Sequence, residues 1–407
     1  MILPTLQSVT IADLDCNMHT KTTVEILNLS LEKIAEIRNL YPINKRQDVL
    51  RYSKELSDYG TATFRVSTKD PLFDSVGDIL MPHRYHVRIK RGTTTVWSGA
   101  IIDNPQRNKN YIEVTAAEYD FYFDKVLIRR DAETVAGDGK NNFRTFSSGT
   151  MAAAVQSIVS NAVTDFGTAH PLGSLTIRTI TNPDYPANFM NESGVALTGG
   201  WTFTDFVTLQ FDYHTVYYVL KAFGVYAAAD FEVDADLNFD FKPYIGNKAT
   251  GITFEYGTQG NVIDYNFPRL GKRMVNNLWG IAADTNGKIL HANQSDTASQ
   301  NTYGLLQGTA AYSDVKDSNM LKSRMAEELQ FTKTSEDTPV NVVLNEKGYP
   351  LGQYGIGDMV TVKIKDNVID FNQPRRIVGI TVTVHNTGRE IIVLQTNKPR
   401  ERDMGGV

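Results

Sequence analysis

Four polar side chains at alternating positions form the segment best suited to binding a metal ion. They are Asp234, Asp236, Asn238 and Asp240. Oxygen ligands at positions 1, 3 and 5 begin the calcium loop of an EF-hand, which also needs glycine at position 6 and glutamate at position 12. The chain has Phe239 and Ile245 at those two positions. We therefore interpret the four side chains as the polar face of a hairpin, and the sequence predicts no metal site here.

Three histidines give weaker evidence for metal binding. His83 and His86 are three residues apart, and His214 precedes a predicted helix. The sequence has no His-Glu-x-x-His motif, and the single cysteine, Cys16, provides no cysteine partner for a zinc site. We expect ordinary surface or strand histidines. Cys16 also lacks the local signature of an activated thiol.

Residues 137–140, GDGK, resemble the end of a phosphate-binding loop. Such a loop needs glycine at the position of Thr134 and serine or threonine at the position of Asn141. We interpret this segment as a flexible loop.

The signals for catalysis are weak as well. The sequence has no Gly-x-Ser-x-Gly nucleophile elbow. Among its 46 acidic residues a glycosidase-like pair would meet only in three dimensions, so the sequence neither identifies nor excludes one. We predict that the chain is not an enzyme and has no catalytic, cofactor-binding or metal-binding residue.

A basic strand edge is formed by Arg84, Arg88, Lys90 and Arg91. It could face passing DNA or the acidic groups of a partner, but we favour a solvated strand face that discourages pairing with another strand. The whole chain has 41 basic and 46 acidic residues, a net charge of −5. This balance gives no electrostatic reason for tight, sequence-independent binding to nucleic acid.

Length and composition indicate a folded protein of three or four domains. The chain has 407 residues, of which 41% are hydrophobic and 21% charged, which excludes wholesale disorder. The single cysteine excludes an internal disulfide. No stretch approaches the ~18 apolar residues of a membrane span, and the N-terminus lacks the pattern of a signal peptide. We expect no stable membrane insertion.

Strand patterns dominate both ends of the chain. In residues 61–67, Ala62, Phe64 and Val66 share one face, and in residues 84–91 apolar residues alternate with His86, Arg88 and Lys90. A meander of strands follows up to about residue 130. The last 55 residues contain strands around 359–365, 375–384 and 389–396, with a loop that includes Pro374. Residues 24–59 fit helix or strand, so their structure stays open.

Three helices and one hairpin are predicted between these ends. The expected N-caps are Thr150, Thr215 and Ser318, and Gly224 is expected to end the second helix. The hairpin runs from Phe231 to Phe241. The apolar stripes of the three helices contain Met151, Val155, Ile158 and Val159; Val216, Val219, Leu220 and Phe223; and Leu321, Met325 and Leu329.

The two β-rich ends form a weak internal repeat. Gly77-Asp78 and Gly357-Asp358 each precede an alternating strand, and two further strands follow in the same order. We therefore predict an α+β, mainly β fold with two similar small antiparallel β-barrels, a helix-hairpin α/β domain and an insertion. The predicted domains are 1–130, with the first barrel; 131–200, a helix-containing insertion or linker; 201–335, the helix-hairpin domain; and 336–407, the second barrel.

Three segments together resemble the tail-tip hub proteins of long-tailed phages, which are related to the central hub of contractile-tail baseplates. The segments stand in the order expected of a hub. They are LRYSKELSDYGTATFRVSTKDP with AAEYDFYFDKVLIRRD; VYYVLKAFGVYAAADFEVDADLNFDF; and YGIGDMVTVKIKD with RRIVGITVTV and GREIIVLQT.

The resemblance implies a structural virion protein, with no enzymatic activity of its own. It implies a homotrimer at the phage tail tip that adapts the six-fold tail tube to a three-fold tip, closes the tube and anchors fibres or a spike. Its partners would be a hexameric distal tail protein, the C-terminus of the tape-measure protein and tail fibre or central spike proteins, with DNA passing through the lumen. Assembly would take place in the host cytoplasm. Because this chain stops soon after the second barrel, host binding and wall cleavage would lie on other chains.

Two other classes of function stay open. A carbohydrate-binding host-recognition module would be favoured if Trp97, Trp201 or Trp279 were exposed on a concave face. A cell-wall glycoside hydrolase is the third alternative.

Overall fold

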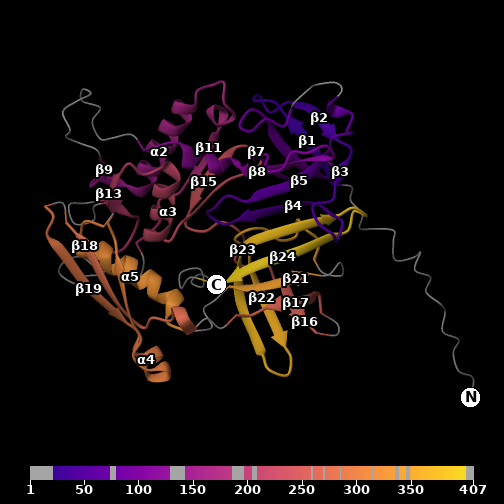
Figure 1. The fold of residues 1–407 in the computed structure, drawn as a ribbon. Coiled ribbons are helices and arrows are strands. Elements are labelled where there is room, and N and C mark those ends of the chain that lie inside the picture. The colour runs from indigo at the N-terminus through magenta and orange to yellow at the C-terminus, as the bar shows by residue number, and fades with distance from the viewer. Residues whose placement is uncertain are drawn as a thin grey trace, which may run out of the picture.

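The computed structural model describes a mainly β, multi-domain chain with helices between its β-rich ends (Figure 1). The described residues are 22–73, 79–128, 143–185, 197–203, 209–257, 260–268, 271–284, 286–313, 315–334, 339–344 and 349–399. The predicted class, a mainly β fold of several domains, is confirmed, with one closed barrel and further sheets. No helix in these ranges is long and apolar enough to cross a membrane.

The N-terminal strands form one antiparallel ladder in the order β2-β1-β6-β7-β8-β5-β4, with β3 paired to β5. Apolar residues alternate into the core as predicted, so Ala62, Phe64 and Val66 of β5 are all buried. The segment 24–59, which fits two patterns in sequence, is strand. The bounds are β1 Thr22–Leu27, β2 Lys33–Ile37, β3 Leu40–Tyr41, β4 Asp48–Glu55, β5 Thr61–Ser67, β6 His86–Arg91, β7 Thr94–Asp103 and β8 Tyr111–Glu118.

The C-terminal strands close into a six-stranded barrel. Its ladder runs β23-β22-β16-β17-β21-β24 and returns to β23 through the β23–β24 pairing. Two of these strands precede residue 336, so the barrel is not made from 336–407 alone. Pro374, expected in a loop, lies within β23 opposite Thr361. The bounds are β16 Thr253–Tyr256, β17 Val262–Asn266, β21 Val340–Leu344, β22 Met359–Lys365, β23 Asp370–His385 and β24 Glu390–Asn397.

The two β-rich ends are joined edge to edge. Strand β4 pairs antiparallel with β23, with Tyr52 opposite Val382, so the N-terminal ladder and the barrel form one continuous sheet. Buried side chains from both ends belong to a single hydrophobic cluster. Within the described residues the N-terminal ladder does not close on itself, because one edge of β4 pairs with β5 and the other pairs with β23 of the barrel. Gly77-Asp78, the first half of the proposed repeat, lies outside the described residues.

A helix-hairpin unit packs between these sheets and a separate lobe. Thr150 and Thr215 cap their helices as predicted, by accepting from the N–H groups of Ala153 and Tyr218. Gly224 lies inside its helix and does not end it; the chain leaves the helix at Ala228, where φ is +43°. The bounds are the 3₁₀ helix η2 Tyr119–Lys125, α2 Met151–Phe166, the 3₁₀ helix η3 Pro171–Ser174, β11 Thr176–Ile180, α3 Val216–Tyr226, β14 Asp230–Val233 and β15 Asn238–Lys242.

Smaller pairings tie the predicted insertion into this unit. Strand β11 pairs parallel with β15, so part of 131–200 belongs to the hairpin's sheet. Two two-stranded sheets also pair residues near 143–150 with residues near 202–212. Their strands are β9 Phe143–Phe146 with β13 Leu209–Asp212 and β10 Gly149–Thr150 with β12 Thr202–Phe203.

The remaining lobe is a three-stranded sheet covered on one face by α5. Its strands follow the order β19-β18-β20. Leu321, Met325 and Leu329 are buried as predicted, but Asp317 caps the helix in place of Ser318. The bounds are the 3₁₀ helix η4 Gly271–Arg273, β18 Asn277–Ala283, β19 Ile289–Ser295, α4 Thr297–Tyr303, β20 Gln307–Ala311 and α5 Ser318–Thr332.

Candidate functional site

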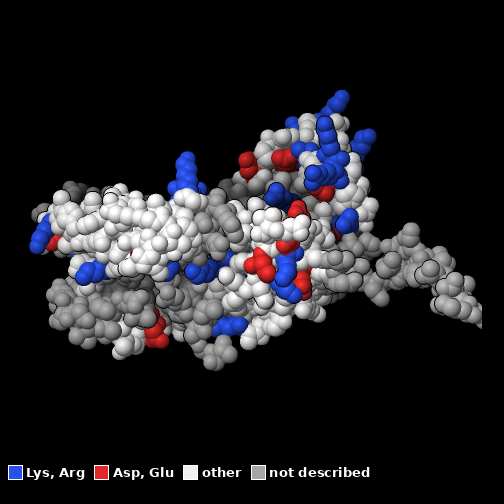
Figure 2. Space-filling model, turned by 90° about the horizontal axis from the view of Figure 1, so that it is seen from below, with Lys and Arg blue, Asp and Glu red and all other residues white. Residues whose placement is uncertain are grey.

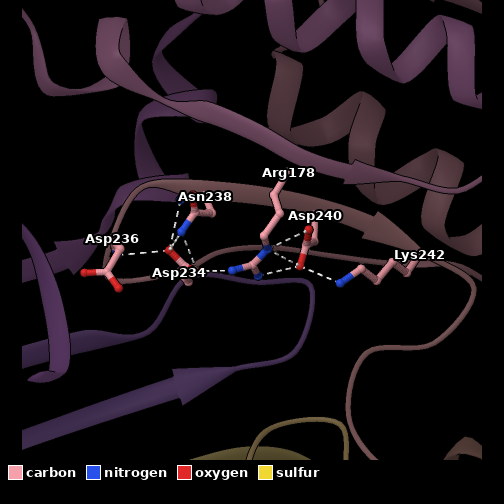
Figure 3. A network of polar contacts seen from close by, with 6 residues as sticks. All are labelled: Arg178, Asp234, Asp236, Asn238, Asp240 and Lys242. Carbon is pink, nitrogen blue, oxygen red and sulfur yellow. Dashed lines mark hydrogen bonds and ion pairs between the residues drawn. The ribbon is translucent and has the colours of Figure 1, made fainter. Parts of the chain in front are cut away.

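Two acidic residues of the β14–β15 hairpin, Asp234 and Asp240, form ion pairs with Arg178 of β11 (Figure 3). Arg178 Nη1 lies 2.7 Å from Asp234 Oδ2, and Nη2 lies 2.5 Å from Asp240 Oδ2. Lys242 Nζ lies 2.6 Å from the same Asp240 oxygen. Asp240 is 0% exposed. The predicted hairpin is present, but its acidic face is covered by cations and is not solvated at Asp240.

Asp234 shapes the turn between the two strands. One of its carboxylate oxygens accepts hydrogen bonds from the backbone N–H groups of Asp236 and Asn238, both at 2.9 Å. The carboxylate of Asp236 is directed away from Arg178 in Figure 3. The oxygens that a calcium loop would use therefore serve the turn and Arg178. No group of three or more histidine, cysteine or acidic side chains in the described part of the chain is arranged to hold a metal ion.

The electrostatics of Asp240 follow from these contacts. Burial by itself would raise the pKa of this carboxyl, but the hydrogen bonds from Arg178 and Lys242 outweigh burial and hold the pKa below its usual value. The ionised form is thus the stable form in the fold. This network joins β11 to the hairpin, and Arg178 could not be found from a local pattern because it lies 62 residues from Asp240.

The basic residues of β6 do not form a sheet edge. Strand β6 lies between β1 and β7. Lys90 and Arg88 lie 3.2 and 3.7 Å from the carboxylate of Glu25, and Lys33 approaches it to 3.0 Å. Burial opposes ionisation of Glu25, but the bonds from Lys33 and Lys90 lower its pKa. The prediction of a basic strand edge is wrong because β1 pairs with β6 and supplies Glu25.

Arg91 and Arg84, the other two residues of the predicted basic edge, lie elsewhere. Arg91 is 3.0 Å from Glu390 of β24, which adds a charged contact between the N-terminal ladder and the barrel. Arg84 is exposed and its guanidinium lies 5.7 Å from the ring centre of Tyr85.

The predicted histidines have different environments. His83 is exposed, and the ring of His214 lies tilted against that of Tyr218 of α3, with 4.2 Å between the ring centres. His86 is 0% exposed, on the side of β6 that the alternating pattern predicted to be polar. That part of the prediction is wrong because η2, which is rich in aromatic residues, covers this side.

Only one of the three tryptophans is on the surface. Trp97 and Trp201 are fully buried, whereas Trp279 of β18 is 47% exposed. Trp279 lies on the sheet face opposite α5, together with the exposed residues Ile281 and Ile289. Figure 2 shows a broad surface with few charged side chains over this lobe, at the left of the view.

A cavity of about 520 Å³ lies where the helix-hairpin unit, α5 and the barrel meet. Its wall includes Gly224, Arg324 and Phe331, and at one side the ion pair between Asp230 of β14 and Arg376 of β23. Asp230 and Arg376 are 146 residues apart, so no sequence pattern connects them. This pair connects the helix-hairpin unit to the barrel, an arrangement suited to joining the two units.

Several predicted positions lie outside the described residues. They are Cys16, Thr134, the GDGK segment 137–140 and Asn141.

Comparison with known proteins gives matches among solved structures alone. No family model matches the chain, and no curated protein matches it. The 43 kDa tail protein of prophage MuSo2 from Shewanella oneidensis aligns over 94% of this chain and 99% of its own length, with a TM-score of 0.58 and 11% identity. A tail protein from Neisseria meningitidis covers 93% and 96%, with a TM-score of 0.57 and 9% identity.

A third solved structure agrees with these two. Prophage tail protein gp18 from Listeria monocytogenes aligns over 93% of this chain and 95% of its own, with a TM-score of 0.52 and 11% identity. This chain has the fold of phage tail proteins. The resemblance predicted from the sequence is thereby confirmed for the fold along nearly the whole length, including the β-rich ends and the unit between them.

Proposed function

We propose that this chain is a structural protein of a phage tail and forms the trimeric hub of the tail tip. The observation that carries the proposal is the match in fold to tail proteins over more than nine-tenths of both chains. We propose no catalytic role. Steady turnover of peptidoglycan by the purified chain, abolished by substitution of a single aspartate or glutamate, would instead support the cell-wall hydrolase.

The joined β-rich ends support a role in adapting symmetry. Each chain has a closed barrel and an N-terminal ladder with a similar order of strands, and β4 and β23 hold them side by side. Three copies around a three-fold axis would present six β-rich units, which matches a six-fold ring. In this proposal the hub meets a hexameric distal tail protein and the tape-measure C-terminus on one side, and fibres or a spike on the other. It closes the tube until DNA passes through, and it resides in the virion after assembly in the host cytoplasm.

The oligomeric state tests the trimer directly. Mass photometry of the purified chain at micromolar concentration should give a particle of three times the 45.4 kDa chain mass, and electron microscopy should show a ring. A strictly monomeric particle under these conditions would contradict the trimeric hub, although the chain would still have the fold of phage tail proteins.

A second candidate is a carbohydrate-binding module, and the exposed ring of Trp279 is the observation that supports it. Exposed aromatic rings provide an apolar face with a polar edge, which suits the faces of sugar rings. A glycan array should show binding that Trp279→Ala abolishes and that Tyr213→Ala, at another exposed aromatic residue, leaves intact. Equal signals from all three proteins would reject this candidate.

A further inference from the structure

Three histidines from two segments of the chain lie around Tyr122 of η2. His83 precedes β6, His86 lies in β6, and His170 is the N-cap of η3. Their ring centres lie 6.2, 6.5 and 4.5 Å from the ring centre of Tyr122. This histidine cluster therefore lies where the N-terminal ladder meets the segment formed by α2 and η3.

His86 is placed where a charge is strongly disfavoured. It is fully buried, and neither ring nitrogen has a hydrogen-bond partner within the described part of the chain. The neighbouring rings are those of Tyr119 and Tyr122. The hydroxyl of Tyr119 forms a hydrogen bond with Ser98, and the buried hydroxyl of Tyr122 has no hydrogen-bond partner within the described part of the chain. Burial, followed by the charges that His170 and His83 would carry, lowers the pKa of His86 to about 3.

His170 needs its Nδ1 atom free of a proton. Nδ1 accepts the hydrogen bond of the Leu172 backbone N–H at 3.2 Å, which caps η3. The ring also stacks on Phe166, at the end of α2, with 4.5 Å between ring centres. Protonation would turn Nδ1 into a donor, so the cap and the charged ring could not coexist. Burial, with a smaller effect of His83, lowers the pKa of His170.

No described carboxylate contributes to the pKa of either ring. The charged groups on the packed elements have other contacts. Arg88 of β6 faces Glu25, and Lys125 of η2 lies over the ring of Phe121. Asp124 of η2 accepts a hydrogen bond from Thr215. Asp120 of η2 is buried, with its pKa raised by burial and by Glu118.

We propose that the histidine cluster is an acid-sensitive latch, which docks the α2–η3 segment on the N-terminal ladder at neutral pH and releases it on acidification. Both imidazoles bind protons more weakly in the docked state than in the open state. Docking is therefore fully favourable above the ordinary histidine value of about 6.5 and weakens as pH falls. Each of the two histidines changes the opening equilibrium by up to about tenfold per pH unit in that range.

Hydrogen–deuterium exchange of the full chain at pH 7.5 and pH 5.5 tests the latch. After correction for intrinsic rates, we expect exchange in 151–175 to rise about tenfold or more at pH 5.5. His170→Asn keeps an N-cap acceptor but does not titrate, and His86→Phe removes the buried imidazole. Each variant should reduce the rise.

His385→Asn is the matched control. His385 Nδ1 also accepts from a backbone N–H two residues ahead, that of Thr387, but in the turn between β23 and β24. This variant should behave as the parent. If His86→Phe does not fold, His170→Asn alone decides. An equal rise in the parent and in His170→Asn would overturn the latch, as would a rise shared equally by α5 and the barrel.

Discussion

Arg376 of the barrel strand β23 forms a buried, bidentate ion pair with Asp230, the first residue of the β14–β15 hairpin. Nη2 lies 2.6 Å from Oδ2 and Nη1 lies 3.3 Å from Oδ1, and both side chains are 4% exposed. Arg376 also donates to the carbonyl oxygens of Gly357 and Ile245. Its charge is thus fully paired, and it links the barrel to the helix-hairpin unit.

Arg376→Met should lower the free energy of unfolding by about 3–5 kcal/mol, because it leaves the carboxylate of Asp230 buried without its cation. Urea unfolding followed by circular dichroism measures this loss. The control is Lys365→Met, which removes an ion pair between Lys365 and Asp370 that is exposed on both sides. That change should cost under about 1 kcal/mol. Similar small losses in both variants would show that the buried pair does not hold the two units together.

Arg178→Met should cost less, about 1–2 kcal/mol, because Arg178 is partly exposed and Lys242 still faces Asp240. The pH dependence is distinctive. The pKa of Asp240 is lowered in the fold, so its ion pairs stabilise the protein above the unfolded value of about 3.9 and are lost as pH falls below it. The difference between parent and variant should therefore be largest above pH 4 and shrink in more acidic solution. A difference independent of pH would point to lost packing of the Arg178 side chain.

Local patterns predicted the elements that depend on local physics. The alternation in β5, the threonine caps of α2 and α3, and the hairpin at 231–241 all rest on residues a few positions apart. The pattern predicts the wrong residue where two neighbouring side chains can each cap the same helix. Asp317 caps α5 in place of Ser318, and its carboxylate accepts from two backbone N–H groups, those of Asn319 and Met320.

The contacts that complete the fold were beyond local patterns. Strand β16 joins the barrel through a parallel pairing with β22, which lies 108 residues further along the chain at Thr253 and Thr361. Strand β17 joins it through an antiparallel pairing with β21. The alternation in β6 predicts that His86 lies on the polar side of the strand. That side is buried because η2 covers it, and no periodicity within β6 can indicate this contact. The sequence pattern also predicts that Gly224 ends its helix, yet Gly224 lies inside α3. An added Cβ there would be 3.0 Å from the Ala229 carbonyl oxygen. These features depend on segments that meet only in the folded chain.

Thr215→Ala should destabilise the helix-hairpin unit by about 1 kcal/mol, because it removes the oxygen that accepts from the Tyr218 N–H group. The hydroxyl also donates to Asp124 of η2 at 3.2 Å, so the cap ties α3 to η2. Thermal unfolding should show a lower midpoint for Thr215→Ala, and Thr215→Ser should restore most of it. A serine variant as unstable as the alanine variant would assign the loss to the methyl group.

Gly99→Ala should be among the most damaging small substitutions in the N-terminal ladder. A Cβ at Gly99 would lie 2.1 Å from the carbonyl oxygen of Ala117 and 2.7 Å from the ring of Trp97, and the first of these atoms is backbone that cannot rotate away. We expect a loss of about 3 kcal/mol or more, since overpacking here must move β8 or the buried indole. Gly271→Ala is the control, because, apart from its chain neighbours, no atom of the described residues lies within 4 Å of an added Cβ there. Urea unfolding followed by tryptophan fluorescence would measure both variants, and a Gly99→Ala protein as stable as Gly271→Ala would show that β7 and β8 can separate without cost.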